Sequence, residues 1–206
     1  MNKGRLEAFS DGVIAIIITI MVLEMKVPGP DAHDLKDLGH LWPVFLSYAL
    51  SYVYLGIYWN NHHHMLHATR QISGGVLWAN LHLLFWLSLV PFVTGWMGES
   101  HFAPQPMAMY GAVMLMAAMA YWILLNSILR VEGPDSLLAR AVGDDWKAKL
   151  SPLLYVVAIG AAFVKPAIAG ALYVLVALIW VVPDRRIERV LADGHARAAT
   201  GSPKHQ

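Results

Sequence analysis

The chain has 206 residues, of which 57% are hydrophobic and only 14% charged, and its formal net charge is +1. A soluble domain usually carries about 25% charged residues, so the composition excludes an ordinary soluble protein and indicates an integral membrane protein. The sequence contains no cysteine, which excludes disulfide bonds, thiolate metal sites and cysteine nucleophiles. We expect the lipid bilayer and no nucleic acid as a partner.

Six apolar segments predict six membrane-spanning helices, because about 20 apolar residues cross the hydrocarbon core. They cover residues 9–27, 38–60, 76–97, 107–129, 150–164 and 167–182. Pro91 predicts a kink in the third segment. The last two segments are short, since 15 helical residues span only about 23 Å, so a re-entrant hairpin is the alternative for this pair.

The distribution of basic residues predicts the orientation. With six spans both termini lie on one side, together with twelve of the 15 lysines and arginines, whereas Lys26, Lys36 and Lys165 lie on the other. The positive-inside rule then places both termini in the cytoplasm. We expect a multi-pass protein of the cell membrane with an all-α domain over residues 1–191 and a disordered cytoplasmic tail over residues 192–206.

The first segment carries one stripe at helical spacing. Ile16, Thr19, Ile20 and Leu23 fall on this stripe. The opposite face, which includes Ile14, is also apolar. Periodicity therefore leaves open which face would line a pore and which would contact lipid or protein.

The head of the first segment is polar, which is costly in a membrane unless the groups are paired. Arg5, Ser10 and Asp11 lie there. One interpretation is that Arg5 pairs with Asp11, or that these groups bond a neighbouring helix. The other is an N-cap, in which Ser10 or Asp11 begins the helix.

Histidines follow the second segment. His63 and His67 are four residues apart and could share a helix face as metal ligands, but no carboxylate nearby completes a ligand set. A pH-responsive role and simple interfacial histidines are the alternatives.

The loop after the first segment is acidic. It holds Glu24, Asp31, Asp34 and Asp37 against Lys26 and Lys36. An excess of negative charge at a channel mouth concentrates cations, although a merely solvated loop would look the same.

The pattern Arg5-x-x-x-Phe9-Ser10-Asp11, followed by Gly12-Val13-Ile14-Ala15-Ile16, resembles the signature of the bacterial branch of the transmembrane protein 175 family of potassium channels. The second-segment ending Tyr58-Trp59-Asn60-x-His62-His63 is similar to that family more loosely.

The resemblance implies a homotetramer whose central pore is lined by four copies of the first helix. It implies apolar rings at Ile16, Ile20 and Leu23, with Thr19 as a neighbouring polar ring. Glu24, from the acidic loop, is then expected at the outer mouth. Arg5, Phe9, Ser10 and Asp11 would pack the inner end of the pore helix against its neighbours.

The function that this resemblance implies is passive, moderately selective potassium conduction through a hydrophobic constriction, with K⁺ as the permeant ion, no cofactor and no enzymatic activity. A proton- or cation-coupled secondary transporter that uses Asp11 and the histidines is the first alternative. A membrane enzyme with a metal at His62–His67 is the second, and it lacks a carboxylate or nucleophile cluster at the same depth.

Overall fold

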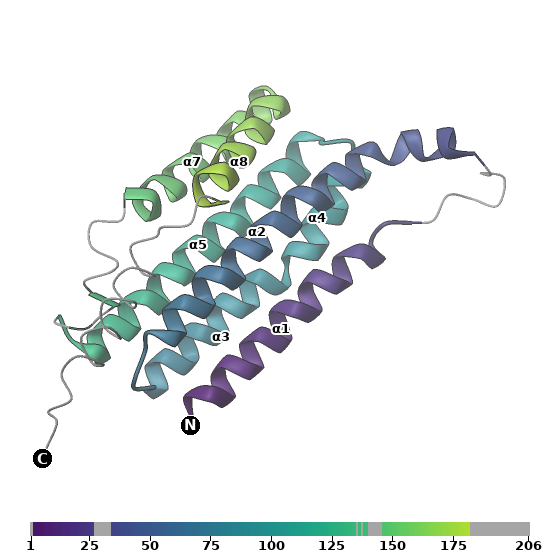
Figure 1. Cartoon of the computed structure of the whole chain (residues 1–206). Helices are drawn as coiled ribbons and strands as arrows, with labels where there is room; N and C mark the ends of the chain where they lie inside the picture. Colours follow the sequence, from purple (N-terminus) through teal and green to yellow (C-terminus); the bar gives the residue numbers. More distant parts are fainter. Residues whose placement is uncertain (1, 27–33, 135, 137, 140–145, 182–206) are drawn as a thin grey trace, which may run out of the picture.

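The computed structural model describes residues 2–26, 34–134, 136, 138–139 and 146–181, and these residues are almost entirely helical (Figure 1). The helices are α1 (Lys3–Leu23), the 3₁₀ helix η1 (Leu35–Leu41), α2 (Trp42–His67), α3 (Gly74–Ser88), α4 (Val90–Glu99), α5 (Pro104–Glu132), α7 (Trp146–Val164) and α8 (Pro166–Val181). The predicted tail over residues 192–206 lies outside the described residues.

The helices begin and end where the local chemistry favours it. Pro43, Pro104 and Pro166 lie in the first turns of α2, α5 and α8, where the missing N–H of proline costs no hydrogen bond. The Asn2 side chain caps α1 by accepting a hydrogen bond from the Gly4 N–H at 3.2 Å. Gly133 follows α5 with a φ of 85°, a conformation that glycine adopts readily.

The kink that Pro91 predicts is confirmed as a break between two helices. α3 ends at Ser88 and α4 begins at Val90. Proline has no N–H for the carbonyl four residues earlier, and its ring crowds that carbonyl. Together α3 and α4 still form one apolar stretch, Gly74–Glu99, that is long enough to cross a membrane.

Five apolar stretches in the described residues are long enough to span a bilayer, and α8, with 16 residues, is shorter. The expectation of a short fifth span was wrong. α7 begins at Trp146 rather than at residue 150 and has 19 residues, with Pro152 inside the helix. Proline is tolerated within membrane helices because neighbouring groups satisfy the freed backbone.

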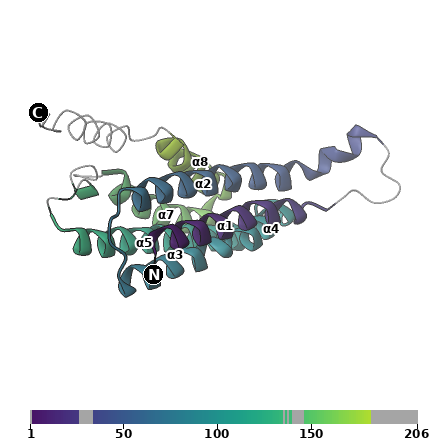
Figure 2. The same ribbon diagram turned by 60° about the horizontal axis from the view of Figure 1, so that its bottom comes forward.

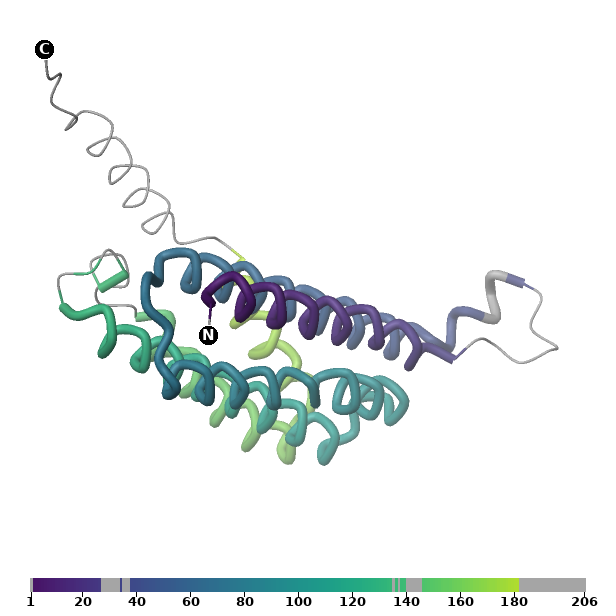
Figure 3. Tube along the Cα trace, turned by 90° about the horizontal axis from the view of Figure 1, so that it is seen from below, coloured from purple at the N-terminus to yellow at the C-terminus, as the bar shows by residue number. Residues whose placement is uncertain are grey.

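The helices form three layers. α1 packs against α2, α3 and α4, whereas α7 and α8 pack against α5 and α2 on the other side (Figure 1). The turned views in Figures 2 and 3 show α1 running beside α2 along most of its length. The helices α2, α3 and α4 thus cover one face of α1. The opposite face of α1 is not covered by α7 and α8, because they lie on the far side of the bundle.

A buried polar cluster joins the middle of the bundle. The Ser51 hydroxyl donates to the Tyr110 hydroxyl at 3.1 Å and lies 2.7 Å from the Thr94 hydroxyl. The Tyr54 hydroxyl donates to the Tyr173 carbonyl oxygen at 2.6 Å. Among the described residues no buried polar side-chain atom lacks a hydrogen-bond partner, which is what a low-dielectric interior requires.

Gly98 allows α4 to approach α2 closely. A Cβ atom at this position would lie 2.7 Å from the Val44 Cα and 3.2 Å from its backbone nitrogen. Because backbone cannot move aside as a side chain can, any larger residue would push the two helices apart.

We expect Gly98→Ala to destabilise the protein by about 1–3 kcal/mol, as overpacking does, which lowers the melting temperature by about 2–4 °C per kcal/mol. Thermal unfolding of the protein in detergent measures the change. Gly160→Ala in α7 is the control, because a Cβ there meets nothing within 4 Å. Equal melting temperatures for the two variants would contradict the close approach.

Candidate ion pathway

α1 has one buried and one exposed face. Its buried residues are Leu6, Ser10, Ile14, Ile17 and Met21. The predicted stripe lies on the other face, with Ile16 58%, Ile20 41% and Leu23 77% exposed. Gly12 and Thr19 are also exposed. The structure therefore separates the two apolar faces that periodicity could not tell apart, and we call Gly12, Ile16, Thr19, Ile20 and Leu23 the exposed stripe.

Thr19 is the one polar side chain of the exposed stripe. Its hydroxyl lies 2.9 Å from the Ile16 carbonyl oxygen and 3.1 Å from that of Ala15, so it donates to its own helix. A hydroxyl that donates its only proton in this way keeps a lone pair as an acceptor. Thr19 therefore presents a weakly negative oxygen among aliphatic groups.

Ser10 anchors the buried face through a chain of hydrogen bonds. The His62 Nε2 donates to the Asn80 Oδ1 at 2.7 Å, the Asn80 Nδ2 donates to the Ser10 Oγ at 2.9 Å, and Ser10 donates to the Leu6 carbonyl at 2.9 Å. Ser10 and Asn80 are fully buried and His62 is 1% exposed. This chain links α1 to α3 and α2.

The N-cap interpretation of Ser10 and Asp11 was wrong, because Asn2 caps α1 and both residues lie well inside the helix. Asp11 instead accepts a hydrogen bond from the Trp59 Nε1 at 3.0 Å. The Trp59 indole N–H thus joins α2 to the carboxylate of α1. The sequence offers no signal for this pairing, because the partners are 48 residues apart.

Arg5 and Phe9 point away from the rest of the chain. Both are exposed, Phe9 by 50%, and in the described part of the chain Arg5 forms no ion pair with Asp11. Their role in packing stays a prediction, since only a neighbouring molecule could cover them.

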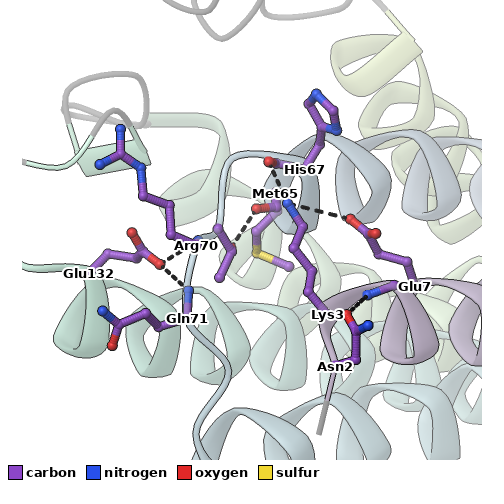
Figure 4. Close-up of polar contacts among 10 residues, drawn as sticks. Asn2, Lys3, Glu7, Met65, His67, Arg70, Gln71 and Glu132 are labelled. Carbon is purple, nitrogen blue, oxygen red and sulfur yellow. Dashed lines mark hydrogen bonds and ion pairs between the residues drawn. The ribbon is translucent and has the colours of Figure 1, made fainter.

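Polar contacts beside Arg70 and His67 join the beginning of α1 to the end of α2, and the end of α5 to the loop that follows α2 (Figure 4). The Lys3 Nζ donates to the His67 carbonyl oxygen at 2.8 Å and lies 3.7 Å from the Glu7 carboxylate. Glu132, the last residue of α5, accepts from the backbone N–H groups of Arg70 and Gln71 at 2.6 and 2.8 Å. The beginning of α1 is thus fixed relative to the end of α2, and the end of α5 relative to the loop between α2 and α3.

His63 and His67 share a helix face, with their rings stacked at 6.1 Å between centroids, and Trp59 stacks on His63 at 5.9 Å. No group of three metal-ligating side chains occurs among the residues that the structure describes. The two histidines therefore gain no third ligand there, and a metal site at this position stays a prediction.

The C-terminal end of α1 and the residues that follow it contact α4. Lys26 forms an ion pair with Glu99 at 2.7 Å, and this carboxylate raises the pKa of Lys26. Glu24 lies beside Gly95, where a Cβ would be 3.1 Å from its Oε2. Asp31 and the side chains of residues 35–37 lie outside the described part. Glu99 follows the third apolar segment, so the acidic loop predicted from the sequence did not include it.

We expect Asn80→Ala to destabilise the protein by about 1–3 kcal/mol, because it leaves His62 without its buried acceptor. Asn126→Ala is the matched control, because the Asn126 amide, within the described part of the chain, bonds the carbonyl of Trp122 in its own helix at 2.7 Å. Melting temperatures in detergent compare the two. A control that melts as low as Asn80→Ala would argue against the anchoring role of this hydrogen-bond chain.

Comparison with known proteins places the chain in a family. Residues 5–91 match the family model described as endosomal/lysosomal potassium channel TMEM175. A protein of Chryseobacterium sp. named a potassium channel is 53% identical over 193 residues, which cover 94% of this chain and 100% of that protein. A Streptomyces collinus protein with the same description is 33% identical over 192 residues, with coverage of 87% and 92%.

The fold gives the same assignment. The crystal structure of a lysosomal potassium-selective channel TMEM175 homolog from Chamaesiphon minutus superposes with a TM-score of 0.75 at 28% identity. The match covers 88% of this chain and 97% of that one. With this sequence identity, this coverage and this helix arrangement, the chain belongs to the TMEM175 family.

Proposed function

We propose that the protein is a moderately selective potassium channel of the cell membrane, with K⁺ as its permeant ion. The observation that carries the proposal is the exposed stripe of α1, an apolar face left uncovered on a helix whose opposite face is fixed by buried hydrogen bonds. The bacterial relatives named potassium channels support it. Residues 1–191 form the channel domain, with both termini in the cytoplasm.

The channel is a homotetramer, and four copies of α1 surround its central axis. One helix cannot enclose a path for ions, so the path needs several copies of the exposed stripe. The exposure of Ile16 and Leu23 on the single chain is what this arrangement requires. Arg5 and Phe9, which are exposed on the single chain, then contact the neighbouring subunit, and Ser10 and Asp11 fix the pore helix within its own subunit.

The constriction consists of apolar rings at Ile16, Ile20 and Leu23, with Thr19 beside them. Such rings supply no oxygen ligands to replace lost water. K⁺ holds its hydration shell less tightly than Na⁺, so partial dehydration costs it less and it passes more easily. The resulting selectivity is moderate, and small rotations of α1 open or close the path by wetting and dewetting the rings.

The outer mouth is formed by the end of α1. Glu24 is exposed there, and a carboxylate at a pore entrance raises the local cation concentration. Lys26 does not cancel this charge, because its ammonium group pairs with Glu99.

Flux through liposomes tests the function. We expect the reconstituted protein to carry K⁺ down its gradient faster than Na⁺, with no requirement for a second ion. Liposomes without protein are the control. Flux that depends on a proton or sodium gradient would instead identify a coupled transporter, and no flux of either ion through folded protein would contradict the channel.

We expect Ile16→Asn to increase the K⁺ flux and lower its preference over Na⁺, because an amide in the ring offers oxygen to a dehydrating ion. Val22→Asn is the matched control on the same helix. Val22 is 44% exposed but lies about 120° around the helix from Ile16. Unchanged flux and selectivity in Ile16→Asn, or equal changes in both variants, would remove Ile16 from the constriction.

A further inference from the structure

Two helices, α2 and α3, each present a polar group that is unpaired within the described part of the chain. His82 of α3 is half-buried, and its Nε2 accepts a hydrogen bond from the Trp86 indole N–H at 2.9 Å. The neutral ring therefore carries its proton on Nδ1, and this N–H has no acceptor among the described residues. The half-buried Asn60 amide of α2 also lacks a hydrogen-bond partner there. Because every buried polar side-chain atom of the described residues is paired, both groups reach the surface of the single chain.

The two groups face outward, on opposite sides of the bundle. Asn60 lies two residues before His62, and His82 lies two residues after Asn80. Two residues correspond to about 160° around a helix. His62 and Asn80 are buried and bond each other, so Asn60 and His82 point away from each other.

The two groups also lie at the same height in the bundle. α2 and α3 are consecutive and run in opposite directions (Figure 3), and the His62–Asn80 hydrogen bond of 2.7 Å sets their register. Asn60 and His82 each lie two residues, about 3 Å, further from the loop that connects the helices. A rotation about the membrane normal preserves height, so it brings Asn60 of one copy level with His82 of another.

The acyl chains of lipid cannot satisfy these groups. His82 lies about 12 Å along α3 from Gly74, within the apolar stretch Gly74–Glu99 that is long enough to cross a membrane. The hydrocarbon region offers no hydrogen-bond acceptor, and ionisable side chains in membrane helices almost always face protein or water and are paired. The unpaired Nδ1–H therefore indicates that protein covers this face of α3.

We propose that the covering protein is a second copy of the chain, and that the His82 Nδ1–H donates a hydrogen bond to the Asn60 Oδ1 of that copy. This contact rests on the proposed homotetramer, in which the outer face of α3 in each subunit packs against the outer face of α2 in the next. Four such contacts form a closed ring around the pore helices, and each donor in the ring has its acceptor.

The surroundings of the two groups fit this contact. Phe85 and Trp78, each about one turn from His82, are 55% and 75% exposed. Gly56 lies one turn from Asn60, and a Cβ atom there would meet nothing within 4 Å. Small residues allow membrane helices to approach closely, so an aromatic ring of one copy can lie over Gly56 of the next.

Disulfide cross-linking of the full chain in membranes tests the contact, because the chain has no native cysteine. On oxidation, we expect Asn60→Cys/His82→Cys to give a ladder up to a covalent tetramer on a non-reducing gel. Within one chain the two positions point apart, so the ladder requires separate copies. Asn60→Cys/Leu178→Cys is the matched control. Leu178 of α8 is 61% exposed, and the hydrogen bond from Tyr54 to the Tyr173 carbonyl places it close to the height of Asn60.

No ladder in the folded double variant, or an equal ladder in the control, would overturn the contact. The cross-link reports assembly rather than ion flux. A cross-linked tetramer that carries no K⁺ would therefore contradict the proposed channel and leave the contact intact, whereas K⁺ flux without a cross-link would contradict the contact alone.

Dissociation of the oligomer on dilution in detergent, followed by native mass spectrometry, measures the hydrogen bond itself. We expect His82→Leu and Asn60→Leu each to weaken association roughly threefold for each hydrogen bond lost. The double variant should be no weaker than either single variant, because all three lack the same bond. Unchanged association in His82→Leu would show that this side chain faces lipid and would overturn the proposal.

Discussion

The hydrogen bonds that Asn80 donates to Ser10 and accepts from His62 are the constraint on which the rest of the structure depends. Polar groups in the membrane interior are stable only when they are paired, and this chain pairs all three. Because Ser10 can reach Asn80 in one rotation of α1 only, the pairing sets that rotation. It therefore also decides that Ile16 and Leu23 stay exposed.

The other helices connect to this hydrogen-bond chain in different ways. In α2, Trp59 bonds Asp11 of α1, His62 bonds Asn80 of α3 and Tyr54 bonds the Tyr173 carbonyl of α8, so α2 links the proposed pore helix to the periphery. The buried cluster around Ser51 holds α2, α4 and α5 together without touching α1. The proposed pore helix is thus fixed along one face, whereas the opposite face is free to meet other copies of the chain.

Much of the fold could be predicted from the sequence, because long apolar runs and prolines act locally. The break at Pro91 follows from its missing N–H. The beginning of α7 could not be predicted from the sequence. A proline often marks the first turn of a helix, and the polar residues Lys147, Lys149 and Ser151 before Pro152 do not continue the apolar pattern. The hydrogen bonds from Trp59 to Asp11 and from Asn80 to Ser10 could not be predicted either, since they join residues 48 and 70 positions apart. No local pattern on α1 distinguishes its two apolar faces.

Cysteine accessibility along α1 tests most directly the central claim that the exposed stripe lines the ion path. The chain has no native cysteine, so a thiol-specific cationic reagent would label only an introduced residue. Single cysteines at Thr19, Ile20 and Val22 would be modified during K⁺ flux through liposomes. The account predicts that modification at Thr19 and Ile20 blocks flux and that modification at Val22 does not. Block at Val22 with none at Thr19 and Ile20 would place the path on a different face of the helix.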